Sequence, residues 1–307
     1  MRWMCNNNTS NSWFRTGHSN RHWFARSLAL SRYTKSAKKT LGNMVLDLAK
    51  KTYFLITGAS RGIGKCMAIE VAKKLKSGSV VVLVARDLVA LEKTKTEIES
   101  KRSDVTVLVY SVDLSKAKAE NFQELLRNSL KQANANADTF ERAFIIHNAG
   151  TVGDVSKSAK DVTDTAIWLD YYHTNVFSTI ALNGEFFEEF SKIPKLVINI
   201  TSLCGIEPFA SMSYYCSGKA AREMYFKVLA VEEKDTETQV LNYAPGPIDT
   251  DMTVLIQRET INKDLQETFK SQRESKTMLT AEQTTAKFIK ILEEVEFTSG
   301  AHIDFFD

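Results

Sequence analysis

The amino-acid sequence predicts an α/β protein with a single domain, in which helices cover both faces of a doubly wound parallel sheet of about seven strands. Two observations predict this class. Short apolar segments of strand length recur along most of the 307 residues. Between them, apolar residues recur at the three- and four-residue spacing of helices that cover a sheet. This alternation is typical of a parallel sheet with helices on both faces.

Seven segments are predicted as strands from their apolar residues. In chain order they are Tyr53–Thr57, Val80–Val84, Val105–Tyr110, Ala143–His147, Leu196–Thr201, Val240–Tyr243 and Ala301–Phe305. Helical spacing is clearest in Lys65–Lys76 and Leu88–Ser100. The polar segment 251–279 interrupts the alternation just after a Pro-Gly turn, and we expect it to form a helical substrate lid over a cleft.

The composition is that of a soluble globular protein, with 43% hydrophobic and 25% charged residues. The formal net charge of +3 is concentrated near the N-terminus, so nucleic-acid binding gains no support. No apolar run approaches the roughly 20 residues of a membrane helix, so we expect no membrane span. The four cysteines have no CxxC spacing. We therefore expect neither disulfides nor a metal site, and a reducing, cytoplasmic compartment fits best.

Residues 1–43 contain no Asp or Glu, and their basic residues are interspersed with Ser, Thr and Asn. Two interpretations stay open. The segment is a disordered or non-native extension, or it is a targeting peptide, because acid-free beginnings rich in Arg and Ser resemble mitochondrial transit peptides. Met44 is also a candidate alternative start, since a complete domain, residues 44–307, follows from it.

A glycine-rich turn directly follows the first predicted strand and opens the first helix, the context in which such glycines indicate phosphate binding. Glycines let the backbone approach a pyrophosphate, and the free N–H groups of the helix N-terminus favour its negative charge. The alternative is a purely structural turn. The dinucleotide interpretation makes the fold Rossmann-like. The residues expected to bind the cofactor here are Gly58, Ser60, Arg61, Gly62, Ile63 and Gly64.

Arg86, at the end of the second strand, favours NADPH over NAD. NAD enzymes usually place a carboxylate there on the ribose hydroxyls, whereas Arg86, with Arg61 nearby, would pair with a 2′-phosphate. Two alternatives remain, because Asp87 can reach the ribose and either arginine can be a solvated surface charge. Further cofactor contacts are expected from Asp113 at the adenine and along the backbone at Asn148, Ala149 and Gly150. Asp87, Tyr215 and Lys219 complete the expected cofactor contacts of this part of the site.

Tyr215 and Lys219 lie four residues apart, hence on one face if this stretch is helical. A phenol is a poor acid at neutral pH, but a nearby ammonium favours its ionised form and lowers its pKa toward the working range. Ser202, at the end of the fifth strand, would then donate a hydrogen bond to a carbonyl oxygen while Tyr215 supplies the proton and the nicotinamide the hydride. Alone, such a Tyr-Lys pair also occurs on ordinary amphipathic helices.

In order and approximate spacing, the glycine-rich turn, Asn-Ala-Gly, Ser202, the Tyr-Lys pair and a Pro-Gly-Pro segment resemble the short-chain dehydrogenase/reductase family. The resemblance implies that Asn175 joins Ser202, Tyr215 and Lys219 in the catalytic group and helps to hold a proton-relay water. It also implies a homodimer, with the other face of the Tyr215 helix at the interface. The Pro-Gly segment is expected to wrap the nicotinamide, with the Ile248 backbone and Thr250 at the carboxamide. The cofactor contacts expected from this segment are Pro245, Gly246, Ile248, Thr250 and Met252.

Longer strings resemble one group of this family, the sepiapterin reductases, over nearly the whole chain from about Tyr53. They span residues 148–157, 201–204, 215–222, 241–252 and 299–305. This resemblance implies an NADPH-dependent reductase of pterin side-chain keto groups in tetrahydrobiopterin biosynthesis. In it, Asp304 would accept the pterin amino group and the adjacent ring N–H together. The substrate contacts implied are Ser202, Leu203, Tyr215, Gly246 and Asp304.

Two alternatives to the pterin function stay open. The first is a broader carbonyl reductase of diketones or quinones, and the second is an NADPH-binding regulator without turnover, since a fold can be retained without catalysis. Two positions also depart from the family pattern. His147 stands where Asn is common, and Thr201 where Ser is usual, but neither change removes a reacting group.

Overall fold

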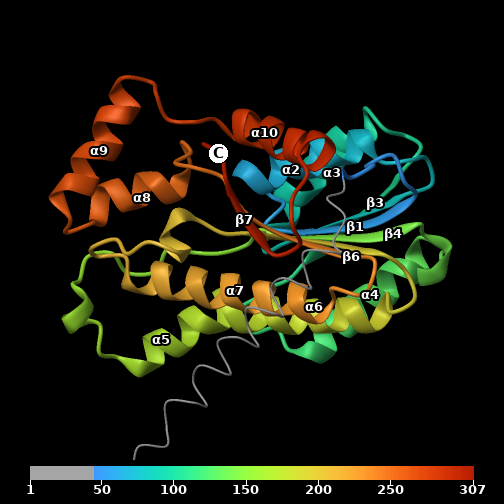
Figure 1. Cartoon of the computed structure of the whole chain (residues 1–307), viewed down its shortest axis with the longest axis horizontal. Helices are drawn as coiled ribbons and strands as arrows, with labels where there is room; N and C mark the ends of the chain where they lie inside the picture. The colour runs from blue at the N-terminus through green and yellow to red at the C-terminus, as the bar shows by residue number, and fades with distance from the viewer. Residues whose placement is uncertain (1–44) are drawn as a thin grey trace, which may run out of the picture. The chain divides into compact units, whose positions relative to one another are not determined.

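The computed structural model describes residues 45–307, so the predicted extension, residues 1–43, lies outside the described residues. All seven predicted strands are present, within two residues of their predicted bounds, and form one parallel sheet in the order β3-β2-β1-β4-β5-β6-β7 (Figure 1). They are β1 (Thr52–Thr57), β2 (Val80–Ala85), β3 (Thr106–Ser111), β4 (Arg142–His147), β5 (Lys195–Ile200), β6 (Thr238–Ala244) and β7 (Ala301–Asp304). The predicted fold class is confirmed.

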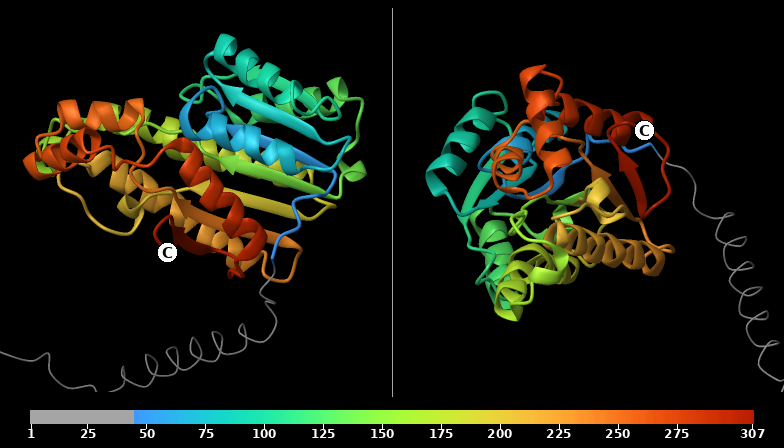
Figure 2. Two further views of the ribbon diagram at one scale, coloured as in Figure 1. Left: turned by 90° about the horizontal axis from the view of Figure 1, so that it is seen from above. Right: turned by 90° about the vertical axis from the view of Figure 1, so that its left-hand side faces the viewer.

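Helices cover both faces of this sheet (Figures 1 and 2). The first face carries α2 (Gly62–Lys74), α3 (Leu88–Glu99) and α10 (Ala281–Glu294). The second face carries α4 (Ala119–Gln132), α6 (Ser178–Glu189) and α7 (Ser213–Glu232). The remaining helical segments are η1 (Ala137–Thr139), η2 (Ala159–Asp161), α5 (Thr165–Tyr172), η3 (His173–Phe177), η4 (Leu203–Gly205), α8 (Asp251–Glu259) and α9 (Lys263–Glu274).

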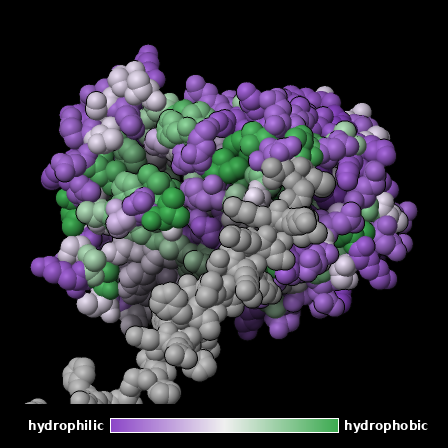
Figure 3. All heavy atoms as spheres, in the orientation of Figure 1, coloured by the Kyte–Doolittle hydropathy of each residue, from purple (hydrophilic) through white to green (hydrophobic). Residues whose placement is uncertain are grey.

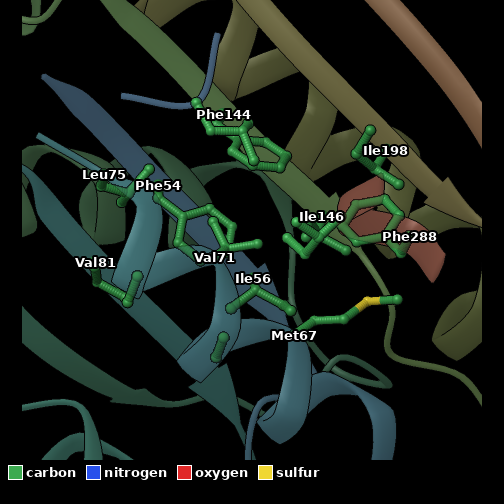
Figure 4. Packing of buried hydrophobic residues seen from close by; sticks show 14 of the residues in the cluster. Phe54, Ile56, Met67, Val71, Leu75, Val81, Phe144, Ile146, Ile198 and Phe288 are labelled. Carbon is green, nitrogen blue, oxygen red and sulfur yellow. The ribbon is translucent and has the colours of Figure 1, made fainter. Parts of the chain in front are cut away.

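The sheet is buried on both faces, which explains why its strands are continuous apolar runs. Successive side chains of a strand point to opposite faces. Phe54 of β1 therefore packs with Met67 of α2 in one cluster (Figure 4), whereas Tyr53 packs with Phe186 of α6 in the other. In the part of the chain that the structure describes, no helix is both long and apolar enough to cross a membrane.

The parallel arrangement places the carboxyl ends of all seven strands at one edge of the sheet. The chain winds outward from β1 through β2 to β3, and then returns to begin β4 on the other side of β1. Ligands of such sheets bind beyond the carboxyl ends of the strands at this change of direction. The segment 251–279, with α8 and α9, follows β6 at the same edge, and Leu279 pairs with Ile248 before α10 begins.

Candidate active site

The glycine-rich turn between β1 and α2 is held against the turn that follows β4. Gly58 and Gly62 have left-handed φ angles of 71° and 55°, which glycine adopts without steric cost. At Gly64 an added Cβ would lie 2.2 Å from the Gly58 carbonyl oxygen, so only glycine fits. The Asn148 amide donates to the carbonyls of Thr57 (3.0 Å) and Gly58 (3.3 Å). Half-buried positions at this junction are Ser60, Ile63, Asn148, Ala149 and Gly150.

Arg61, which we predicted at a 2′-phosphate, pairs with a carboxylate of the chain itself. Its guanidinium lies 2.5 Å from the Asp251 carboxylate at the start of α8, and both side chains are 75% exposed. Such an exposed pair contributes at most about 1 kcal/mol, so a stronger anion can displace Asp251. Arg86 follows β2 and is exposed.

The two carboxylates predicted near the adenosine accept hydrogen bonds from their own segments. Asp87 caps α3 by accepting from the Ala90 N–H at 3.0 Å. Asp113 accepts from the hydroxyl (2.8 Å) and the N–H (3.1 Å) of Ser115, and these bonds lower the pKa of Asp113, with a smaller contribution from Arg86. Because Asp87 is engaged in capping a helix, Arg86 is the better placed of the two to meet a ligand.

Ser202, Tyr215 and Lys219 come together where β5 ends beside α7. Ser202 Oγ accepts from the Cys204 N–H at 3.2 Å, and the Ser202 side chain also hydrogen-bonds the Tyr215 phenol. Lys219 is buried, and its Nζ donates to the Ile200 carbonyl at 2.6 Å. The same Nζ lies 5.4 Å from the centroid of the Tyr215 ring. Three of the four predicted catalytic side chains thus share one corner of the carboxyl edge.

The electrostatics of this corner differ from the prediction. Burial raises the pKa of Tyr215, and the Cys204 thiol adds to this, while Arg222 and the hydrogen bond from Ser202 oppose it. Burial also lowers the pKa of Lys219 well below its usual range. The expectation that Lys219 lowers the pKa of Tyr215 is therefore wrong here, because desolvation dominates both groups. At neutral pH Tyr215 keeps its proton, which is the form that a proton donor requires.

Asn175 lies in a π-helical turn, η3, between α5 and α6. Its Oδ1 accepts from the Thr151 N–H at 2.7 Å, and its Nδ2 donates to the Tyr171 carbonyl at 2.9 Å. The side chain therefore joins this turn to the segment after β4, beside Gly150. Its backbone carbonyl accepts from Arg222 at 3.5 Å. Short π-helical turns are frequent at functional sites.

The Pro-Gly segment after β6 lies beside the glycine-rich turn. A Cβ added at Gly62 would meet only the Thr250 methyl group, at 3.9 Å, so the two segments face each other across a narrow space. Gly246 has a φ of 76°, and an added Cβ would contact Leu279, Phe305 and Phe306. Pro245 and Ile248 are buried, whereas Gly246, Thr250 and Met252 are half-buried.

Asp304 ends β7 at the same edge as the catalytic corner. It pairs with Ala244 of β6, and its Oδ1 accepts from the Phe306 N–H at 3.1 Å. Ser202 lies two residues beyond the end of β5, and β5 and β7 are two strand spacings, about 10 Å, apart. Leu203, beside Ser202, is 44% exposed. These predicted substrate contacts therefore border one region of the edge.

A small apolar cluster joins this region to α8 and α9. Figure 3 shows hydrophobic atoms gathered over α8 on the face in view. The buried members are Val152, Val155, Met212 and Ile256. Partly buried members include Cys204, Phe209, Tyr215, Cys216, Met252, Leu255, Leu265 and Phe269. The cluster supplies an apolar wall next to the Tyr215 phenol.

Two charged residues at this site were missed from the sequence. Arg222 and Glu223 are 1% and 2% exposed, although charged residues on a helix are usually assigned to its solvent face. Glu223 accepts from Thr201 Oγ1 (2.8 Å) and Lys227 Nζ (2.6 Å), and lies 3.0 Å from His302 Nδ1. The sequence signal that could have placed Arg222 at the site was helical spacing. Arg222 lies two turns after Tyr215 and hence on the same face of α7.

This fold, with a glycine-rich turn, a Ser-Tyr-Lys corner and an Asn-Ala-Gly turn at one edge, defines an oxidoreductase that uses a nicotinamide cofactor. The chain belongs to the short-chain dehydrogenase family, because the sequence model described as short chain dehydrogenase matches residues 52–260. The short-chain dehydrogenases/reductase from Saccharomyces cerevisiae has the same fold, with a TM-score of 0.68 and 25% identity over 84% of this chain and 96% of that one. A protein from Shigella flexneri complexed with NADP has a TM-score of 0.67 and 22% identity, over 85% of this chain and 99% of that one.

Within the family, the chain is similar to sepiapterin reductases. It is 38% identical to that of Xenopus tropicalis over 82% of this chain and 95% of the relative. It is 36% identical to that of Bos taurus, over 84% and 95% respectively. The benzil reductase ((S)-benzoin forming) of Bacillus cereus is 28% identical, over 81% of this chain and 96% of that protein.

Proposed function

We propose that the chain is an NADPH-dependent carbonyl reductase that reduces the side-chain keto groups of pterins, a reaction of tetrahydrobiopterin biosynthesis. The observation that carries the proposal is the shared edge. Ser202, Tyr215 and Lys219 meet at the same carboxyl edge of the sheet as the glycine-rich helix start, and Asp304 ends β7 at that edge, two strands from β5. Similarity to sepiapterin reductases supports the substrate class.

The residues present fit a dinucleotide. Gly62 takes a left-handed φ of 55° at the start of α2, and the first N–H groups of that helix favour the negative charge of a pyrophosphate. Arg86 would hold a 2′-phosphate together with Arg61, once the phosphate has replaced Asp251 as the partner of Arg61. Because NADPH carries this phosphate and NADH does not, the two arginines support NADPH. The other residues that would hold the cofactor are Gly58, Ser60, Ile63, Gly64, Asp113, Asn148, Ala149, Gly150, Pro245, Gly246, Ile248, Thr250 and Met252.

NADPH, when bound, would supply the hydride that the carbonyl carbon of the substrate gains. Tyr215 donates its phenolic proton to the carbonyl oxygen, and its raised pKa keeps that proton in place until the oxygen gains charge. Ser202 donates a hydrogen bond to the same oxygen. Lys219 holds α7 against the end of β5 through the Ile200 carbonyl. Asn175 fixes the turn beside the cofactor site and would help to hold a relay water.

Asp304 is the proposed pterin anchor. One of its oxygens accepts from the Phe306 N–H, so the carboxylate is oriented and keeps acceptor capacity for the pterin amino group and ring N–H. Leu203 and Gly246 would contact the ring. The segment with α8 and α9 would close over the substrate as a lid, with its apolar cluster excluding water.

A homodimer in the cytoplasm is also proposed. Met224, Val228 and Val231 of α7 are 61%, 47% and 63% exposed, which supports an interface on the outer face of this helix.

Residues 1–43 would decide between the cytoplasm and a mitochondrial location. Expression of the chain with and without these residues, followed by microscopy, tests the two locations.

Similarity to benzil reductases favours a second candidate, a reductase of simple diketones. The test is NADPH oxidation with sepiapterin beside a diketone panel, for the wild type and for Asp304→Ala. Under the pterin proposal, Asp304→Ala loses sepiapterin turnover and keeps diketone turnover. Equal activity of the two proteins on both substrates would favour the second candidate, and NADPH binding without any oxidation would indicate a regulator.

A further inference from the structure

The segment that follows β7 folds into a tight turn at the carboxyl edge of the sheet. The Phe306 N–H donates to the Asp304 carboxylate at 3.1 Å, and the Asp304 N–H donates to the Asp307 carboxylate at 2.7 Å. The Phe305 N–H donates to the Ala244 carbonyl of β6 at 2.9 Å. The backbone of this turn is therefore held both from within and by the neighbouring strand.

This fixed turn presents an exposed aromatic side chain. Phe306 is 71% exposed. Its ring meets the Phe305 ring edge to face, with the two centroids 5.1 Å apart and the planes at 87°, and this contact orients it. A single exposed apolar residue is common on protein surfaces. The surroundings of the Phe306 ring therefore decide whether it has a function.

The Phe306 ring lies next to Gly246, one of the proposed substrate contacts. Gly246 has a φ of 76°, and a Cβ added there would lie 3.5 Å from Phe306 Cε2 and 2.7 Å from Leu279 Cδ1. The absence of a side chain at Gly246 thus leaves room for the ring beside the backbone. Because the Phe306 N–H also donates to Asp304, Phe306 adjoins two of the proposed substrate contacts.

The Asp304 carboxylate and the Phe306 ring recognise different parts of a flat heteroaromatic molecule. A carboxylate accepts hydrogen bonds from N–H groups, which lie in the plane of such a ring. An aromatic side chain instead packs against the apolar face of a ring, and it does so with any flat aromatic partner. An aliphatic carbonyl compound offers neither the N–H groups nor the flat face.

We propose that Phe306 is a specificity-determining residue of the carbonyl-reducing site, which favours substrates with a flat aromatic ring next to the carbonyl by packing against that ring. This inference rests on the proposed function and adds a contact to it. The hydride and the proton are both transferred at the carbonyl, so Phe306 takes no part in bond making. Loss of its ring should therefore raise KM and leave kcat nearly unchanged.

The test compares three carbonyl substrates that differ in what they offer to this turn. Sepiapterin has a flat ring with N–H donors, phenylpropanedione has a flat ring without them, and diacetyl has no ring. We expect Phe306→Ala to raise KM about tenfold for sepiapterin and for phenylpropanedione, which is the usual size of a lost aromatic contact. The KM for diacetyl should stay within about twofold, as should kcat for all three substrates.

Two further variants separate a flat aromatic contact from apolar volume. Phe306→Tyr keeps the ring and should retain the wild-type KM values. Phe306→Leu keeps an apolar side chain without a flat face, so its KM for both aromatic substrates should fall between those of the wild type and Phe306→Ala. Val295→Ala, at a 38% exposed position after α10, is the control for lost apolar surface and should alter none of these values.

Several results would overturn the proposal. If Phe306 only held Asp304 in place, Phe306→Ala would impair sepiapterin turnover and leave phenylpropanedione turnover intact. An equal rise in KM for all three substrates would indicate a general disturbance of the site. A Phe306→Leu variant that matches the wild type would show that no flat face is needed.

Failure of the proposed function gives a different result. A wild type that reduces phenylpropanedione but not sepiapterin contradicts the pterin function, while phenylpropanedione and diacetyl together still decide the role of Phe306. Calorimetry with the same substrates and oxidised NADP measures binding without turnover, and Phe306→Ala should weaken binding of the two aromatic substrates about tenfold. A wild type that neither reduces nor binds any of the three overturns both proposals.

Discussion

Arg61 and Asp251, which lie 190 residues apart in the sequence, form an ion pair that links the glycine-rich turn to the first residue of α8. The pair bridges two of the segments that are proposed to hold the cofactor. It also occupies the guanidinium that the sequence assigns to a 2′-phosphate. Asp251 and that phosphate are therefore expected to compete for Arg61.

Asp251→Asn tests this competition. The substitution removes the competing anion, and we expect the KM for NADPH to fall by about two- to fivefold, the range that an exposed pair of up to about 1 kcal/mol allows. The KM for NADH should change less, because NADH has no 2′-phosphate. Asp264→Asn, on α9, is the control. A KM for NADPH that stays constant or rises would contradict the competition.

Arg86→Gln addresses cofactor choice. A charge-assisted hydrogen bond to the 2′-phosphate is lost while NADH gains nothing, so the ratio of kcat/KM for NADPH over NADH should fall by about tenfold or more. Steady-state kinetics with both cofactors measures the ratio. Arg127→Gln, an exposed position on α4, controls for a general loss of positive charge. An unaltered ratio would mean that Arg86 is only a solvated surface charge.

Glu223→Gln probes the buried link between β5, α7 and β7. Burial would raise the pKa of Glu223, but the hydrogen bonds from His302, Lys227 and Thr201 lower it to about 2. A lowered pKa means that the carboxylate stabilises the fold at neutral pH and that this contribution is lost as the pH falls toward 2. We expect Glu223→Gln to cost about 3 kcal/mol at neutral pH, and progressively less in acid.

Urea unfolding at several pH values measures this difference. Glu232→Gln, an exposed position of the same helix, serves as the control and should have little effect. A cost for Glu223→Gln that is the same at neutral pH and at about pH 3 would argue against a charged Glu223 in the folded protein.

Gly64→Ala and Gly184→Ala are a matched pair of helical glycines. At Gly64 the added Cβ meets the Gly58 carbonyl at 2.2 Å, and a backbone atom cannot move aside cheaply, so we expect a loss of about 1–3 kcal/mol and weaker NADPH binding. At Gly184, in α6, nothing lies within 4 Å. There the substitution should stabilise by about 0.5–1 kcal/mol. Thermal unfolding and cofactor titration check both, and equal effects would contradict the packing argument.

The strands and the strand-end residues could be predicted because their signals are local. A strand buried on both faces must be apolar along its whole length, and a residue that follows it must lie at the carboxyl edge. Ser202, Asn148 and Asp304 follow from this rule, since each lies at or just beyond the end of a predicted strand. The order of the strands in the sheet then determines which of these strand ends lie next to each other.

The rest depends on partners that are distant in the sequence. Arg222 can be buried because the carbonyls of His147 and Ala149 accept hydrogen bonds from its guanidinium. The sequence of the helix does not predict these acceptors. The π-helical turn at Asn175 has no reliable sequence signal. The raised pKa of Tyr215 also could not be read from its spacing to Lys219, because spacing reports a neighbour and not the loss of solvent.

The transfer of a hydride to a pterin side-chain carbonyl, with Tyr215 as the proton donor, is the central claim. NADPH carrying deuterium at the transferred position is incubated with sepiapterin and the chain, and the product is weighed by mass spectrometry. We predict one deuterium on the former carbonyl carbon with the wild type, and a rate about 10²- to 10⁴-fold lower with Tyr215→Phe at unchanged NADPH binding. Product without deuterium, or a Tyr215→Phe variant as fast as the wild type, would contradict it.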